Sequence, residues 1–303
     1  MTEALVVKPP IALSAIKALR IKQWTKNGAL FLPLLFAKGV VREGLPLKSA
    51  VAVGAFSLLA SGVYLVNDWA DRDKDRHHPE KRHRPIAAGL LSLPLVAMMV
   101  AACWGGAAAL GLWVGTPFLS VCFAYLVLQV LYTWVLKKAV ILDVMAIALG
   151  FILRVVAGAV AINVVVSNWL FLCTLLLAVF LGFAKRRHEL SSLEGSASAH
   201  RANLEDYSLP MLDQMMSISA ASTILAYGLY TVSAETVLHV GSDKLKFTVP
   251  LVVYGVFRYL FLVHKRGAGG SPEKVLLSDP PLMVAIGLWV AIAAWALYLP
   301  NGL

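Results

Sequence analysis

Four aspartates stand close together in the stretch NDWADRDKDRHHPEKRHRPIAAG, residues 67–89, between two strongly apolar runs. If the preceding helix continues into this stretch, Asn67, Asp71 and Asp75 share one face, with Asp68 beside them. Their oxygen atoms suit a hard divalent cation such as Mg²⁺, which fills its remaining positions with water and phosphate oxygens. We therefore predict all four residues as metal ligands, and the three aspartates as catalytic residues.

Two other interpretations of this stretch stay open. A solvated loop, in which five acids balance six bases, would need no ligand. His77, His78 and His83 raise the question of zinc, but their spacing fits no usual zinc pattern and the neighbouring acids favour a harder ion.

The elements that position these residues are predicted to be membrane helices. The chain has 303 residues, a mean hydropathy of +0.75, and only 15% charged residues, whereas soluble domains carry about 25%. Its apolar runs are about twenty residues long, enough to cross a bilayer as helices. We expect an all-α polytopic protein with one domain, 1–303, no cleaved secretory signal, and about nine transmembrane helices. The expected spans are 28–41 (short), 48–68, 91–111, 117–136, 140–162, 167–184, 214–232, 246–264 and 281–299.

The net charge of +10 is concentrated in alternate connections between these spans. The positive-inside rule then places the N-terminus and the charged loops, including the aspartate-rich loop 67–89, on the cytoplasmic side of a bacterial-type inner membrane, with the C-terminus outside. Residues 11–26 begin with an amphipathic stretch that we expect to lie along the interface. We expect no nucleic-acid partner, and a homo-oligomer is left open.

Several basic residues are placed to bind phosphate oxygens. Lys81, Arg82 and Arg84 directly follow the aspartates, where they could hold phosphate groups. Arg154 lies near the middle of its span, where a buried arginine costs roughly 2.5 kcal/mol or more. We favour an anion-binding role for Arg154, facing a water-filled cavity, over an interhelical salt bridge. Gly150 would allow close packing around that cavity, as would Gly158.

The pattern YLVND-x₂-D-x₃-D-x₂-HP-x-KR-x-RPIAAG resembles the first aspartate-rich motif of the UbiA superfamily of intramembrane prenyltransferases. Its extension HPEKRHRPIAAG is similar to the form found in the decaprenyl-phosphate phosphoribosyltransferase branch. Further segments resemble that branch in the same order: IKQWTKN at 21–27, the helix at 136–162, AKRRHEL at 184–190, FRYLFLVH at 257–264 and GSPEKVLLSDPPL at 270–282.

The resemblance implies a UbiA-like ring of helices around a central cavity that faces the cytoplasm. It also implies Mg²⁺-dependent transfer of 5-phosphoribose from phosphoribosyl pyrophosphate to a polyprenyl phosphate of the decaprenyl type. Diphosphate would be released, and the product would serve lipid-linked arabinose and cell-envelope synthesis. The substrate-binding residues expected from motifs and charge are Lys22, Lys26, Tyr64, Lys81, Arg82, Arg84, Lys137, Arg154, Lys185, Arg186, Tyr207 and Arg258.

One segment departs from the wider superfamily. Prenyltransferases with aromatic acceptors usually carry a second motif of the DxxxD kind, whereas RANLEDYSLPMLDQMMSIS at 201–219 has Glu205, Asp206 and Asp213 without that interval. EDYSLPMLDQ looks like the tyrosine-containing segment of the phosphoribosyl branch. An aromatic prenyltransferase remains the main alternative, and a polyprenyl-phosphate transporter without catalysis is the second.

Overall fold

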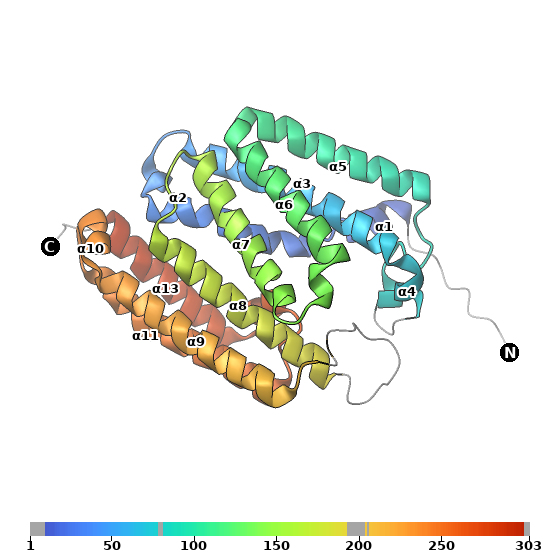
Figure 1. Ribbon diagram of the computed structural model, residues 1–303. Helices are drawn as coiled ribbons and strands as arrows, with labels where there is room; N and C mark the ends of the chain where they lie inside the picture. Colours follow the sequence, from blue (N-terminus) through green and yellow to red (C-terminus); the bar gives the residue numbers. More distant parts are fainter. Residues whose placement is uncertain (1–9, 78–80, 193–203, 205, 300–303) are drawn as a thin grey trace.

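The computed structural model describes residues 10–77, 81–192, 204 and 206–299, and these residues fold into helices and connections without a strand (Figure 1). His78, Glu80 and Glu205 of the sequence analysis lie outside the described residues. The α-helices are α1 (Ile11–Ala18), α2 (Leu32–Phe36), α3 (Leu45–Ala70), α4 (Arg72–Arg76), α5 (Leu93–Val114), α6 (Thr116–Trp134), α7 (Leu142–Ala161), α8 (Asn168–Ser191), α9 (Leu209–Val232), α10 (Ala234–Val240), α11 (Val249–Arg266), α12 (Pro272–Ser278) and α13 (Pro280–Tyr298). The 3₁₀ segments are η1 (Ile21–Phe31), η2 (Gly39–Val41), η3 (Lys81–His83), η4 (Leu136–Lys138) and η6 (Lys244–Thr248).

Eight helices of the described chain are long and apolar enough to cross a membrane: α3, α5, α6, α7, α8, α9, α11 with η6, and α13. This confirms the prediction of an all-α polytopic membrane protein. Helices α3 and α7 bury most of their membrane window inside the protein, whereas the other six bury less than half of theirs. The bundle is therefore organised around α3 and α7.

The short span predicted at 28–41 is helical but is not one continuous α-helix. These residues belong to η1, α2 and η2, and Pro33 lies in the first turn of α2. Because proline has no N–H to donate and clashes with the preceding turn, it is tolerated where a helix begins but breaks a longer one. Among the described residues, eight of the expected spans are thus long α-helices, and the short span at 28–41 consists of shorter helical pieces.

The η1–α2 segment nevertheless connects the two ends of the bundle. Arg20, just before η1, contacts Asp68 at the end of α3. Past α2, Lys38 donates to the carbonyl of Val240 at 2.8 Å, and the Tyr298 hydroxyl donates to the carbonyl of Leu35 at 3.0 Å. At the usual rise of 3₁₀ and α-helices, η1 and α2 together cover roughly 30 Å, about the thickness of the hydrocarbon core.

The two ends of the bundle differ in character. We call the end at which α3 stops and α4 begins the acidic end, and the end formed by α10 and the C-terminal turn of α13 the far end; Figure 1 shows α4 and α10 on opposite sides. The charged connections that the sequence places on one side of the membrane meet at the acidic end, because their residues form ion pairs there. Which side of the membrane that end faces remains a prediction.

Helix α1 has an exposed apolar face, on which Ile11, Leu13 and Ile16 are each more than half exposed. Such a face on a short helix at the edge of a membrane bundle is typical of an interfacial segment. The interfacial placement of 11–26 stays a prediction, and within it η1 begins at Ile21 and runs into the bundle.

Candidate functional site

The acidic end is built around two buried carboxylates that share one guanidinium. Asp68 comes from the last turns of α3, and Asp75 lies on α4. Nη1 of Arg84 donates to Oδ1 of Asp68 at 2.9 Å and to Oδ2 of Asp75 at 2.7 Å, while Arg20 also contacts Oδ1 of Asp68. A cavity of about 230 Å³ opens at this cluster, between Arg20, Asp68, Arg84 and His83.

The chain changes direction at Asp71, which ends α3 and precedes α4. The expected face of Asn67, Asp71 and Asp75 is therefore not one uninterrupted helix. Asn67 instead accepts a hydrogen bond from Thr133 of α6 at 3.2 Å. The half-buried Asp71 lies between the two carboxylates in sequence.

The donor set of this cluster fits a hard divalent cation. In the described residues, no three side chains of His, Cys, Asp or Glu converge as a ready-made metal site. Instead, Nη1 of Arg84 bridges Asp68 and Asp75. A cationic group already bridges the two carboxylates, and every predicted ligand offers oxygen, the donor that Mg²⁺ prefers. The four predicted ligands thus remain a prediction that the chemistry of the site allows.

A second polar group lies on η1 and α12. Oε1 of Glu273 accepts from Gln23 at 3.0 Å and lies 3.6 Å from Nζ of Lys26. Burial alone would raise the pKa of Glu273, but Lys26, Gln23 and Lys185 hold that pKa below its ordinary value. Glu273 is therefore an ionised carboxylate inside a cluster of cations. Lys26 is also within electrostatic range of Arg20, so this group adjoins the acidic end.

Arg154 is buried on α7 and donates to neutral groups. Its Nε donates to Asn27 at 2.9 Å, its Nη1 to the carbonyl of Gly150 at 2.8 Å, and its Nη2 to the hydroxyl of Tyr125 at 3.0 Å. Its guanidinium also lies 5.5 Å from the centre of the Phe56 ring. Among the described residues it forms no ion pair, so the interhelical salt bridge that the sequence left open is not present. Its role toward an anion stays a prediction.

Arg186 and Tyr207, both predicted to bind substrate, meet at Asp143. Nε of Arg186 lies 2.5 Å from Oδ2 of Asp143, and both side chains are fully buried. The Tyr207 hydroxyl donates to Oδ1 of Asp143 at 3.0 Å and accepts from the N–H of Ile141 at 2.6 Å. Burial, reinforced by the charge of Asp143, raises the pKa of Tyr207 to about 12. This cluster links α7, α8 and the start of α9.

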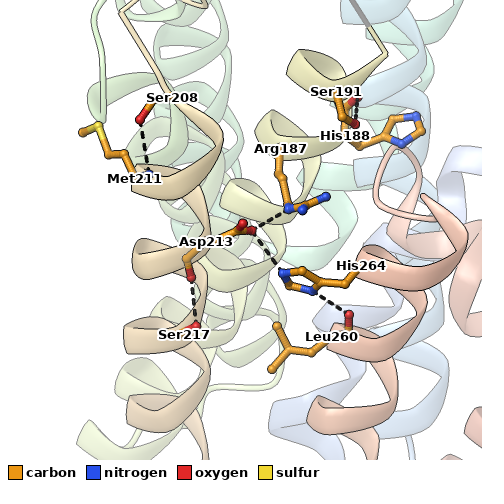
Figure 2. A network of polar contacts seen from close by, with 9 residues as sticks. All are labelled: Arg187, His188, Ser191, Ser208, Met211, Asp213, Ser217, Leu260 and His264. Atoms are coloured by element: carbon orange, nitrogen blue, oxygen red, sulfur yellow. Dashed lines mark hydrogen bonds and ion pairs between the residues drawn. The ribbon is translucent and has the colours of Figure 1, made fainter. Parts of the chain in front are cut away.

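Two further groups of ion pairs, around Asp213 and Asp279, lie where α8, α9, α11 and α13 reach the acidic end. Figure 2 shows Asp213 of α9 between Arg187 and His264. Oδ1 of Asp213 accepts from Nε of Arg187 at 2.5 Å and lies 3.1 Å from Nε2 of His264. Arg258 donates from Nε to Oδ1 of Asp279 at 3.0 Å and from Nη2 to Oδ2 at 2.9 Å. Oδ1 of Asp279 also caps α13 by accepting from the N–H of Leu282. Asp213 thus joins α8, α9 and α11 through its ion pairs.

An apolar cavity of about 340 Å³ lies among α2, α8, α9, α11, α12 and α13. Phe36, Tyr230 and Ser167 line it toward the far end, and Tyr259 and Leu276 line it toward the acidic end. Leu276 is one turn from Glu273 on α12. The cavity therefore runs from the far end to the polar group of Glu273 and Lys26.

The predicted residues thus divide into groups. Asp68, Asp75 and Arg84 share a cluster, Tyr64 lies beside it with its ring 5.1 Å from Arg20, and Lys26 and Lys185 surround Glu273. Lys22, Lys81, Arg82 and Lys137 lie on the 3₁₀ segments η1, η3 and η4.

Sequence reasoning missed four residues of the site. Arg20, Asp143 and Glu273 carry charge in or beside apolar runs, which is the signal that could have found them. Gln23 carries no such signal. It is identified only by its contact with Glu273, 250 residues away along the chain.

Residues 29–278 match the sequence profile of the UbiA prenyltransferase family. The chain is 35% identical over 301 residues to a decaprenyl-phosphate phosphoribosyltransferase from Mycobacterium tuberculosis, covering 96% of this chain and 97% of that protein. It is 32% identical over 306 residues to a protein of the same description from Corynebacterium glutamicum, covering 96% and 90%. In each comparison, the match covers at least 90% of this chain and of its relative.

The fold is also similar to that of a solved protein. A UbiA homolog from Archaeoglobus fulgidus bound to GPP and Mg²⁺ superposes with a TM-score of 0.69 at 17% identity, over 94% of this chain and 99% of that one. At this identity the likeness concerns the arrangement of the helices.

Proposed function

The chain belongs to the UbiA prenyltransferase family, and from that premise we propose that it transfers 5-phosphoribose from phosphoribosyl pyrophosphate to a polyprenyl phosphate. Diphosphate is the leaving group, and the product belongs to lipid-linked arabinose precursor synthesis for the cell envelope. The proposal is supported by the full-length likeness to two proteins described as decaprenyl-phosphate phosphoribosyltransferases.

The observation that carries the proposal is the junction of the acidic end with the apolar cavity. One substrate has two phosphate-bearing arms and the other has one phosphate on a long apolar chain. The acidic end offers Arg20 and Arg84, Lys26 pairs with Glu273 nearby, and the apolar cavity extends to Leu276, one turn from Glu273 on α12. A phosphate held at this junction has cations on one side and apolar lining on the other.

The acidic residues would hold the donor's diphosphate through a divalent cation. Asn67, Asp68, Asp71 and Asp75 are the ligands we propose for Mg²⁺, which when bound supplies Lewis-acid neutralisation of the leaving diphosphate. Arg84 then exchanges its two carboxylate contacts for phosphate oxygens, to which a guanidinium can bind through two nitrogens. Arg20 neutralises the same cluster from η1.

The reaction needs no general base from the protein. The acceptor's phosphate is already an anion near neutral pH, so an oxygen of that phosphate forms the new bond to C1 of the ribose while the bond to diphosphate breaks. The lysines and arginines of the junction orient the two substrates and stabilise the charge that moves to the leaving group. The apolar cavity would hold the part of the lipid nearest its phosphate.

A transfer assay tests the proposal. Purified protein with Mg²⁺ and polyprenyl phosphate receives either phosphoribosyl pyrophosphate labelled in its 5-phosphate or a labelled prenyl diphosphate with an aromatic acceptor. We expect label from the first donor in the lipid fraction. Label transferred only from the prenyl diphosphate would establish the aromatic prenyltransferase instead, and movement of lipid across vesicles without donor turnover would establish a transporter.

A further inference from the structure

Two buried polar atoms lack hydrogen-bond partners where the apolar cavity meets the acidic end. The Tyr259 hydroxyl is one of them, on a side chain that is 2% exposed and lines the cavity. Oε2 of Glu273 is the other, although Oε1 of the same carboxylate contacts Gln23 and Lys26. Within the described residues, neither atom has a hydrogen-bond donor or acceptor opposite it. A buried polar group without a partner costs about 1–3 kcal/mol.

Both atoms are held firmly in place. Tyr259 packs its ring edge-on against Phe180 at 5.5 Å between centres, and Glu273 is fixed by Gln23 on η1. The two side chains interact electrostatically, so they belong to one local group. An unpaired acceptor and an unpaired hydroxyl in one local group are the arrangement expected where a bound molecule completes the hydrogen bonds.

The ligand that fits is a neutral hydroxyl. Lys26 and Lys185 already surround Glu273, so the carboxylate is ionised, and an ionised carboxylate repels phosphate oxygens. A carboxylate is also the group that proteins use to accept hydrogen bonds from ribose hydroxyls. A prenyl diphosphate has no hydroxyl to offer and would leave both atoms unpaired.

We infer that Glu273 and Tyr259 bind the 2- or 3-hydroxyl of the donor's ribose and thereby select a sugar donor over a prenyl donor. This inference rests on the proposed function. The position agrees with the order of the reacting groups, because the ribose must lie between its diphosphate and the acceptor phosphate. Glu273 lies between the acidic end, which it reaches through Lys26 and Arg20, and the cavity that begins at Leu276.

The test compares phosphoribosyl pyrophosphate with its 2-deoxy and 3-deoxy analogues as donors. The wild type should lose about 10- to 100-fold in kcat/KM with one of the two analogues, the loss expected when a hydrogen bond to a charged group is removed. The discrimination is the ratio of kcat/KM for phosphoribosyl pyrophosphate to kcat/KM for that analogue. In Glu273→Gln this ratio should fall by about tenfold, because a neutral acceptor replaces a charged one. Tyr259→Phe, which keeps the ring and removes only the hydroxyl, should reduce it as well. Glu235→Gln, an exposed acid on α10, is the matched control and should keep wild-type discrimination.

The outcomes separate the inference from the function on which it rests. If the wild type transfers phosphoribose but accepts all three donors equally, the inference is overturned alone. The inference is also overturned if Glu273→Gln lowers kcat/KM by the same factor for all three donors, since that result indicates an effect on phosphate binding through Lys26. If the wild type transfers nothing from phosphoribosyl pyrophosphate, the proposed function and the inference are both overturned.

Discussion

Gly158 of α7 faces the backbone carbonyl of Leu30 so closely that a Cβ atom at position 158 would lie 2.1 Å from the carbonyl oxygen. This contact lets the 3₁₀ segment η1 lie directly against α7 inside the bundle. Gly150, on the same helix, has no such constraint, because its Cβ would lie 3.5 Å from the nearest atom, Nη1 of Arg154.

We therefore expect Gly158→Ala to destabilise the protein by about 1–3 kcal/mol, because the backbone of η1 must move to admit the methyl group. Gly150→Ala should leave the unfolding temperature near that of the wild type. Thermal unfolding in detergent measures both variants. Equal unfolding temperatures for the two would contradict the close packing of α7 on η1.

Asp143→Asn tests the buried cluster at the start of α7. The substitution removes a carboxylate that pairs with the fully buried Arg186, and breaking such a pair by removing one partner costs about 3–5 kcal/mol. Asp213→Asn is the control, since Asp213 is more than one third exposed and its pairs are weakened by solvent. We expect a large loss of thermal stability in the first variant and a small one in the second; similar losses would argue against a structural role for Asp143.

Filling the apolar cavity should affect lipid substrates according to their length. Gly255 lines the cavity, and a Cβ there would meet Leu282 at an ordinary 3.7 Å, so Gly255→Leu should fold and reduce the cavity volume. Because the cavity would hold the part of the lipid nearest its phosphate, we expect a raised KM for every polyprenyl phosphate that reaches Gly255 and little change for one too short to reach it. Gly287→Leu, on an exposed part of α13, should change neither KM. If Gly255→Leu leaves the KM of every lipid unchanged, the lipid tail does not occupy this cavity.

Glu273 should make the stability of the protein depend on pH. Its pKa in the folded protein lies below the ordinary value of 4.5, because the cations outweigh the effect of burial. As pH falls, Glu273 therefore takes up its proton in the unfolded chain before it does so in the folded protein. The contribution of Glu273 to the free energy of unfolding is complete above about pH 4.5 and decreases below it. The difference in unfolding temperature between wild type and Glu273→Gln should narrow across this range; a constant difference would show that the carboxylate charge contributes nothing.

Hydropathy and motifs predicted the class of fold because membrane spans are a local property of about twenty residues. Charge alternation likewise predicted which connections meet at one end. The division of the first span into η1, α2 and η2 could not be predicted, since it depends on Pro33 and on packing against α7, and neither effect appears in an average of hydropathy. Its path through the bundle depends on contacts with Asp68 and Tyr298, which are distant in sequence.

The candidate site was predictable where charge stood out from its surroundings. Asp68, Asp75 and Arg84 come from one contiguous stretch of 17 residues, so their proximity could be expected from their nearness in the sequence. The pairing of Glu273 with Lys26 brings together the two ends of the chain, and no local pattern encodes such a contact. Long-range pairings of this kind decide which cations remain available to a substrate.

The central claim is that the acidic end binds the donor's diphosphate through a divalent cation, and one binding measurement tests it most directly. Labelled phosphoribosyl pyrophosphate is titrated into purified wild type and Asp71→Ala, each with and without Mg²⁺. Asp73→Ala is the control, because the Asp73 side chain is 69% exposed and pairs with Arg72 and Arg76. We expect Mg²⁺ to tighten donor binding at least about tenfold, or about 1.4 kcal/mol, in wild type and Asp73→Ala and to leave Asp71→Ala unaffected. Donor binding that is equally tight without Mg²⁺, or equally Mg²⁺-dependent in Asp71→Ala, would contradict the account.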